Sequence, residues 1–136
     1  MKYKFIEGLK SDVMFEAYGK DLKELFENAA LALLSVMCEI KKVKPLKKEK
    51  FEMKGNDLEE LIFNWLSGLI AVSEIEHMFF SKVNVVKVDE KKVVAELYGE
   101  PMAPAKGGTV VKAVTFYAFK LEKTKEGYKV RISLDI

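Results

Sequence analysis

The strongest pattern in the chain is the stretch Gly55-Asn56-Asp57-Leu58-Glu59-Glu60-Leu61-Ile62-Phe63-Asn64-Trp65-Leu66-Ser67-Gly68-Leu69-Ile70. Asp57 follows two turn-forming residues and is a good helix N-cap, because its side chain can accept a free N–H of the first turn. Apolar side chains then recur every three or four residues, as a helix with one buried face requires: Leu58, Leu61, Ile62, Trp65, Leu66, Leu69 and Ile70. The stretch therefore predicts a long amphipathic helix packed on a core.

A second helix of the same kind is predicted earlier in the chain. Asp21 is its N-cap, and Glu24, three residues later, completes a pair that resembles a capping box. One face is apolar: Leu22, Leu25, Phe26, Ala29, Ala30, Leu33 and Leu34. This helix is expected to run from Asp21 to about Met37 or Cys38.

Segments with alternating apolar and polar residues surround the two helices and predict strands. They are residues 2–6, 12–18, 83–88, 93–98, 110–121 and 128–136. Residues 40–54 also predict a strand, interrupted at Pro45 and rich in lysine, as exposed sheet edges often are. The pattern indicates an α+β fold in which two long helices pack on a mostly antiparallel sheet, as a single domain over residues 1–136.

Composition narrows the class of protein. The chain has 136 residues, of which 49% are apolar and 32% charged, and no apolar run is long enough to span a bilayer. The N-terminus is charged, unlike a secretory signal, and Cys38 is the single cysteine. We therefore expect a cytoplasmic protein. Its many lysines and glutamates, and its lack of glutamine, are typical of thermophiles.

The basic residues leave two interpretations open. Net charge is +2, and every basic residue except Arg131 is a lysine. A dense lysine cluster lies in the predicted edge strand: Lys41, Lys42, Lys44, Lys47, Lys48 and Lys50. The cluster predicts either a surface that docks on RNA or an acidic protein, or a solvated edge that resists aggregation.

Residues that often carry catalysis are isolated here. His77 is the only histidine, so the Glu74-x-x-His77 spacing lacks the second copy that a di-iron site needs. Cys38 is expected to be buried in or near the first helix. Gly107-Gly108 precede a strand rather than a helix, which favours a turn over a phosphate-binding loop. The residues predict no catalytic machinery.

Carboxylates offer one metal-site hypothesis. Asp12 opens the second predicted strand, and Asp135 lies on the polar side of the last one. Two such carboxylates on neighbouring strands, with the α-carboxylate of Ile136, would supply three hard oxygen ligands. Ligands of that kind suit calcium, magnesium or manganese.

A series of motifs, in order along nearly the whole chain, resembles the archease family. They are Ala17-Tyr18-Gly19-Lys20, residues 22–33, Gly55-Asn56-Asp57-Leu58-Glu59-Glu60-Leu61, Asn64-Trp65-Leu66, residues 95–100, Val111-Lys112-Ala113-Val114-Thr115 and Leu134-Asp135-Ile136. The resemblance implies an SHS2-like α+β fold. It also implies a non-enzymatic accessory protein that activates an RtcB-type RNA ligase, promoting its guanylylation and multiple turnover in tRNA splicing or RNA repair.

The resemblance also implies site residues. The family has a divalent-metal site formed by an aspartate after the first strand and one at the C-terminus, which correspond to Asp12 and Asp135. The carboxylate of Ile136 is implied as a third ligand, and Lys112 matches a functional lysine. The family reads His-Thr-Ala-Asp where this chain has residues 9–12, and Thr-Tyr-His where it has residues 115–117, so metal affinity is expected to be weaker.

Other functions are compatible with the sequence. The same resemblance implies a chaperone-like modulator of a tRNA cytosine methyltransferase. The lysine cluster at 41–50, with Lys41, Lys42, Lys44, Lys47 and Lys48, fits a direct RNA-binding module whose binding falls with salt. A hydrolase built on the carboxylates is a third alternative, which turnover of a phosphate ester without any partner would reveal.

Overall fold

The computed structural model describes residues 1–7 and 12–136. Its helices are α1 (Leu22–Met37) and α2 (Leu58–Glu76), with a short 3-10 turn at Pro104–Lys106. Its strands are β1 (Tyr3–Ile6), β2 (Asp12–Gly19), β3 (Lys47–Lys54), β4 (Met78–Val88), β5 (Lys92–Pro101), β6 (Ala113–Thr124) and β7 (Gly127–Asp135).

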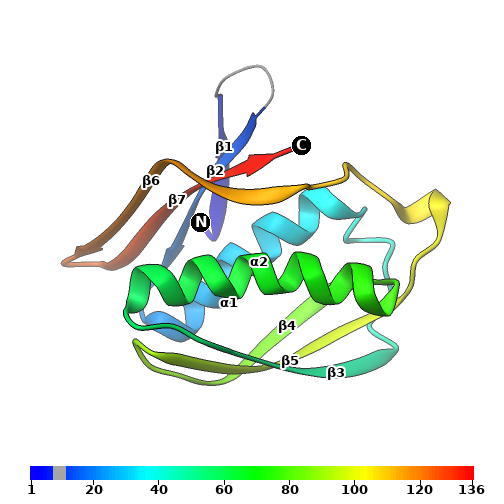
Figure 1. Ribbon diagram of the computed structural model, residues 1–136, viewed down its shortest axis with the longest axis horizontal. Helices are drawn as coiled ribbons and strands as arrows, with labels where there is room; N and C mark the ends of the chain where they lie inside the picture. The colour runs from blue at the N-terminus through cyan, green and yellow to red at the C-terminus, as the bar shows by residue number, and fades with distance from the viewer. Residues whose placement is uncertain (8–11) are drawn as a thin grey trace.

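The two helices lie between two antiparallel sheets (Figure 1). Within the described residues, one sheet has the strand order β1-β2-β7-β6 and the other the order β3-β5-β4. The α+β class and the two long helices are confirmed. The single sheet that the sequence suggested is instead divided in two, so both helices are covered on two sides.

Both helices begin with an aspartate N-cap. The Asp21 carboxylate accepts the Glu24 N–H at 2.9 Å, and the Asp57 carboxylate accepts the Glu60 N–H at 2.8 Å. These bonds satisfy donors that have no partner inside the helix, and they hold each helix start at one residue. The predicted N-caps are therefore confirmed.

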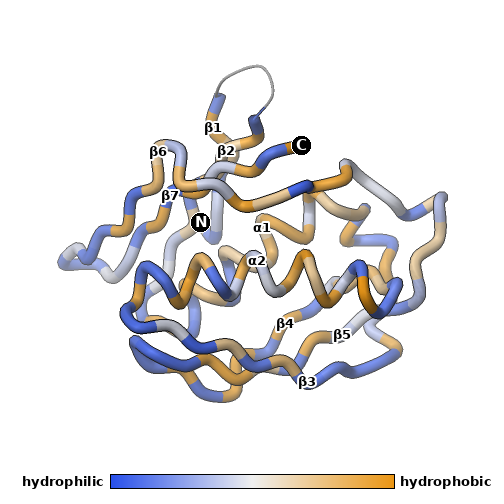
Figure 2. The backbone as a smooth tube through the Cα atoms, in the orientation of Figure 1, coloured by the Kyte–Doolittle hydropathy of each residue, from blue (hydrophilic) through white to orange (hydrophobic). Residues whose placement is uncertain are grey.

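Trp65 joins three layers of the core. It is fully buried, and its indole N–H donates to the Phe26 carbonyl of α1 at 3.1 Å. The rings of Phe26 and Phe51 lie 5.8 and 5.5 Å from it, so α2 contacts both α1 and β3 through one side chain. In Figure 2 the strands alternate between hydrophilic and hydrophobic residues, as burial of one sheet face requires.

Several strand boundaries differ from the prediction. β4 begins at Met78 rather than residue 83, and β5 ends at Pro101 rather than residue 98. β3 begins at Lys47, and residues 40–46 form a turn and loop instead of the first part of an edge strand. Pro45 explains the late start, because it has no N–H for a ladder and restricts the residue before it. The predicted edge position of β3 is confirmed. β6 starts at Ala113 rather than residue 110.

An ion pair on α1 covers the free edge of β4. The Lys23 ammonium donates to the Val85 carbonyl at 2.9 Å, and the Val85 N–H donates to the Glu27 carboxylate at 2.9 Å. Lys23 and Glu27 are themselves 2.8 Å apart. Both backbone groups of Val85 are thus occupied by side chains, which blocks pairing of that edge with another strand.

Replacing Glu27 with alanine should expose this edge. We expect Glu27→Ala to lower the free energy of unfolding by about 1–3 kcal/mol, because it removes the acceptor of a buried N–H. It should also promote self-association through β4. Urea denaturation and light scattering after size exclusion would measure both effects, with Glu90→Ala in the exposed β4–β5 turn as the control. A variant as stable and as monomeric as the control would contradict this role.

Candidate functional site

The carboxylates of Asp12 and Asp135 lie on adjacent strands at the same level of the sheet. The two residues are direct partners in the antiparallel pairing of β2 with β7. Directly opposed side chains point to the same face, with Cβ atoms about 4.5–5.5 Å apart. The juxtaposition that the sequence predicted for Asp12 and Asp135 is therefore present.

Core packing on the opposite face fixes this register. Val13 opposes Leu134, which in turn opposes Val114 of β6. Leu134 is fully buried, and Val114 is buried as well. Because side chains alternate along a strand, a slip of one residue would move these apolar groups into solvent. The core therefore holds the two aspartates on the outer face.

Lys112 reaches the same end of the sheet. Its N–H donates to the Asp135 carbonyl at 2.7 Å, and Ala113 is the strand partner of Asp135. The Lys112 side chain is exposed. Asp135 is thus held on one side by β2 and on the other by the start of β6. Lys112 directly precedes Ala113, the residue of β6 that pairs with Asp135.

The candidate metal ligands at this end of the sheet are all hard oxygen atoms. Among the residues that the structure describes, no three His, Cys, Asp or Glu side chains are grouped closely enough to hold a metal ion. Asp12 and Asp135 supply two carboxylates, and the third predicted ligand, the carboxylate of Ile136, directly follows Asp135. Such a set fits Mg²⁺, Ca²⁺ or Mn²⁺ better than Zn²⁺. An opposed pair of like charges is otherwise unfavourable in a sheet.

The lysine cluster predicted at residues 41–50 lies elsewhere and does not form one strand. Lys41, Lys42 and Lys44 are exposed in the loop before β3, while Lys47 and Lys48 begin β3 itself. β3 belongs to the sheet across the helices from the chain's C-terminus (Figure 1). The structure therefore separates this cluster from the paired aspartates.

Cys38 and His77 have structural positions. The Cys38 thiol is buried and donates to the Leu34 carbonyl at 3.4 Å, and burial raises its pKa to about 11. His77 is exposed and ends α2 in a left-handed conformation, with φ 52°. A protonated, buried thiol is a poor nucleophile, and the two residues serve packing and helix termination.

The two departures from the family motifs have different outcomes. Leu9, Lys10 and Ser11 lie outside the described residues. In the second departure, β6 loses its register with β7 between Thr115 and Lys120. Ala118 adopts a positive φ of 53° there, and the buried Ser133 hydroxyl donates to the Tyr117 carbonyl at 2.7 Å. Sequence reasoning missed this irregularity.

An apolar hollow beside Lys112 was also missed. Its volume is about 310 Å³, and it opens between the C-terminal ends of the helices and the loop before β6. Met37, Phe79, Met102, Val110 and Val111 line it, with Glu74. Val110 is 76% exposed and lies two residues before Lys112. Residues from several separate segments line the hollow, so no local sequence pattern predicts it.

Farther along the outer face, Glu16 forms the centre of an ion network. Arg131 donates to its carboxylate at 3.0 Å, Tyr18 donates at 3.1 Å, and Lys129 lies 3.8 Å away. Burial alone would raise the pKa of Glu16, but the hydrogen bonds from Arg131 and Tyr18 and the charge of Lys129 lower it overall. The single arginine of the sequence is thus bound to Glu16 on this outer face. No described helix is long and apolar enough to cross a membrane.

Comparisons with known proteins agree along the whole chain. Residues 3–136 match the Archease protein family (MTH1598/TM1083). The chain is 37% identical to protein archease of Sulfurisphaera tokodaii, with 99% of each chain covered, and 36% identical to that of Methanosarcina acetivorans, with 99% of this chain and 96% of the relative covered.

Solved structures give the same picture of the fold. The solution structure of Methanobacterium thermoautotrophicum protein 1598 superimposes with a TM-score of 0.81 at 29% identity, covering 98% of both chains. The crystal structure of a Thermotoga maritima archease, described as a possible chaperone, has a TM-score of 0.70 at 18% identity and covers 94% of this chain and 93% of that one.

The Glu16 network predicts a pH dependence of stability. Because the folded pKa of Glu16 lies below its ordinary value of 4.5, the network stabilises the fold above that value and is lost as the pH falls through the folded pKa. Glu16→Gln should lower the free energy of unfolding at pH 7 by about 1–3 kcal/mol and flatten its decline in acid. Urea denaturation between pH 3 and pH 7 would measure this. An unchanged pH profile would exclude the network as the cause.

Proposed function

Since this chain belongs to the archease family, we propose that it is a non-enzymatic accessory protein that activates an RtcB-type RNA ligase in tRNA splicing or RNA repair. The observation that carries the proposal is the direct pairing of Asp12 with Asp135. This pair is the part of the molecule best suited to act on a partner's phosphate chemistry. The protein would work in the cytoplasm, beside the enzymes that handle tRNA.

In this proposal Asp12 and Asp135, with the carboxylate of Ile136, hold a divalent cation at the open end of the sheet. A cation held there would neutralise charge that develops on the phosphates of the ligase reaction. Lys112 is exposed beside the pair and would contact the partner's acidic or phosphate groups. The core-fixed register keeps the two carboxylates aligned before the partner arrives.

The bond-making chemistry stays on the ligase. Cys38 is buried with a raised pKa, and His77 lies exposed at a helix end, so neither is arranged with a base or nucleophile. The apolar hollow beside Lys112 supports a protein partner, because exposed apolar surface is typical of protein contacts. A tRNA cytosine methyltransferase, handled in a chaperone-like way, is the alternative partner for the same end of the molecule.

Metal binding should be visible without any partner. Adding Mg²⁺, Ca²⁺ or Mn²⁺ should raise the melting temperature, since an ion that binds the folded state stabilises it by about 2.7 kcal/mol at 100 times its dissociation constant. Asp135→Asn should be more stable than the parent without metal, by about 0.2–1 kcal/mol, because a like-charge pair is removed. It should also lose the response to metal.

Glu59→Gln on the exposed first turn of α2 is the matched control. It removes one carboxylate from the surface and should keep the metal response. If the Asp135→Asn variant responded to metal as strongly as this control, the paired aspartates would not be the site.

Ligase activation tests the function itself. Multiple-turnover, GTP-dependent ligation by an RtcB-type ligase should be stimulated by this protein and should lose nearly all stimulation with Asp12→Ala or Asp135→Ala. Glu59→Ala should remain active. Full stimulation by the double aspartate variant would exclude the metal mechanism. A folded parent that gives no stimulation would exclude the ligase as client and direct the same assay to a tRNA methyltransferase.

A further inference from the structure

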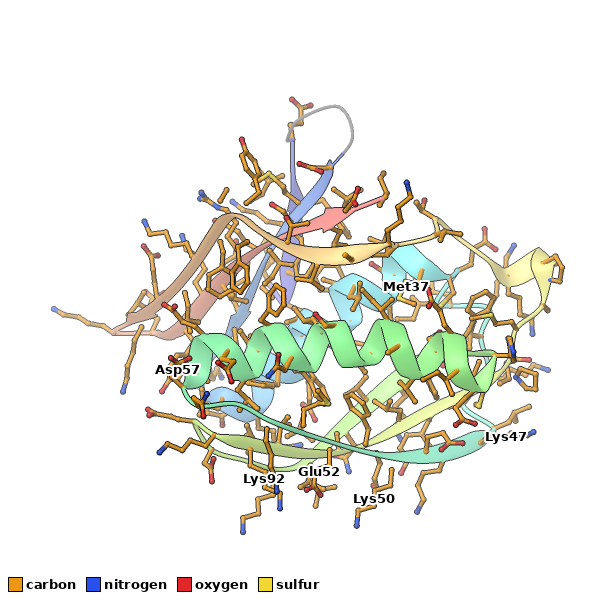
Figure 3. The ribbon with its side chains drawn as sticks, in the orientation of Figure 1. Met37, Lys47, Lys50, Glu52, Asp57 and Lys92 are labelled. Atoms are coloured by element: carbon orange, nitrogen blue, oxygen red, sulfur yellow. The ribbon has the colours of Figure 1, made fainter. Side chains whose placement is uncertain are left out.

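The outer face of the β3-β5-β4 sheet concentrates lysines from three strands. We name this surface the lysine face. All of its lysines are exposed, and they alternate with residues that face the core: Lys48, Lys50 and Lys54 on β3, Lys92 on β5, and Lys82 and Lys87 on β4. Figure 3 shows Lys50 and Lys92 pointing away from the helices.

Strand register places these lysines in rows across the sheet. Lys48 and Lys82 flank Tyr98, and Lys50 lies across Glu96 from Asn84. Neighbouring strands are about 4.8 Å apart, and alternate residues of a strand about 6.6 Å. The ammonium groups therefore form a two-dimensional array rather than the linear cluster that residues 41–50 suggested.

Acidic residues pair with two of the six lysines. In the strands of this sheet, all of which the structure describes, the outer face carries Glu52, Glu96 and Glu100. Glu52 lies 3.3 Å from Lys92 and Glu96 lies 3.5 Å from Lys48, while Glu100 pairs with Lys106 outside this sheet at 2.9 Å. Glu96 accepts hydrogen bonds from Asn84 at 3.2 Å and from Tyr98 at 3.1 Å, which lower its pKa. The whole chain has a net charge of only +2, so the rest of the molecule is net negative.

The other sheet provides an internal comparison. Its outer face carries four basic residues and four acidic ones: Lys4, Lys120, Lys129, Arg131, Asp12, Glu16, Glu122 and Asp135. Each of the four basic residues lies within 3.8 Å of the carboxylate of Glu16 or Glu122. Both sheets belong to the same lysine-rich chain. A lysine-rich composition alone therefore does not produce the excess on the lysine face.

We propose that the lysine face binds the phosphate backbone of nucleic acid, without reading its sequence. The apolar hollow described above lies beside Lys112 and not on this face, and lysine is depleted in protein interfaces, so a phosphate backbone fits the face better than an acidic protein. The Lys82 ammonium covers the Tyr98 ring at 4.9 Å, which leaves no open aromatic platform for base stacking. Single-stranded RNA and DNA of one sequence should therefore bind alike.

Fluorescence anisotropy with a 20-nucleotide single-stranded RNA, titrated against salt, tests the proposal. The triple variant Lys50→Gln, Lys54→Gln, Lys87→Gln removes three positive charges from the face. For purely electrostatic binding it should weaken affinity on the order of 100-fold at 0.1 M salt and lower the salt slope by about 2. The control triple variant Lys41→Gln, Lys44→Gln, Lys125→Gln removes the same charge from exposed positions elsewhere and should bind within a few-fold of the parent.

Three results would overturn the proposal. They are no salt-dependent binding by the parent protein, an equal loss in the control variant, and competition by polyglutamate as effective as competition by polyuridine. The last result would assign the face to an acidic protein. Melting curves of both variants establish that they remain folded. Ligase stimulation by the lysine variant is independent of this outcome, because the paired aspartates lie on the other sheet.

Discussion

The antiparallel pairing of β2 with β7 is the constraint on which the rest of the structure depends. It joins segments from the two ends of the chain at the centre of the four-stranded sheet. Its alternation sends Phe15 and Ile132 into the core beneath α1 and leaves polar groups outside. The opposition of Asp12 to Asp135 follows from the same register. A change in the core that shifted this register would therefore disturb the candidate site without touching it.

The helices could be predicted almost residue by residue, but the division into two sheets could not. The apolar stripe and the Asp21 cap located α1, which begins at Leu22 and ends at Met37 as expected. Alternation in a strand shows which face is buried, yet it carries no information about which strand lies next to it. Each of the seven described strands was therefore predicted as a segment, whereas the strand beside β3 was not. The irregularity of β6 near Tyr117 was not predicted for the same reason, because it involves a hydrogen bond from Ser133 on another strand.

The pairing of Asp12 with Asp135 was predictable because both residues lie at strand ends, whereas two other surface features were not. Asp12 and Asp135 each occupy the polar side of an alternating segment, so pairing of those segments was enough to bring them together. The apolar hollow near Val110 and the lysine face combine residues from separate segments. The run of lysines at 41–50 was misleading, because residues 40–46 form a turn and loop around Pro45, so only the lysines from Lys47 onward belong to β3. The resulting molecule has a charge-balanced sheet that ends in paired carboxylates and a basic sheet on the other side of the helices.

The topology also sets an order of events during folding. The β4–β5 and β6–β7 hairpins can close between neighbours in sequence, and the two helices have their own caps. β2, by contrast, must wait for β7, and loop closure over nearly the whole chain is slow in comparison. An intermediate with both helices and both hairpins would thus have a nearly complete hydrophobic centre while Asp12 and Asp135 were still apart. Competence to bind at the candidate site would then appear only with the last long-range contact, so it would distinguish the native chain from its nearly folded precursors.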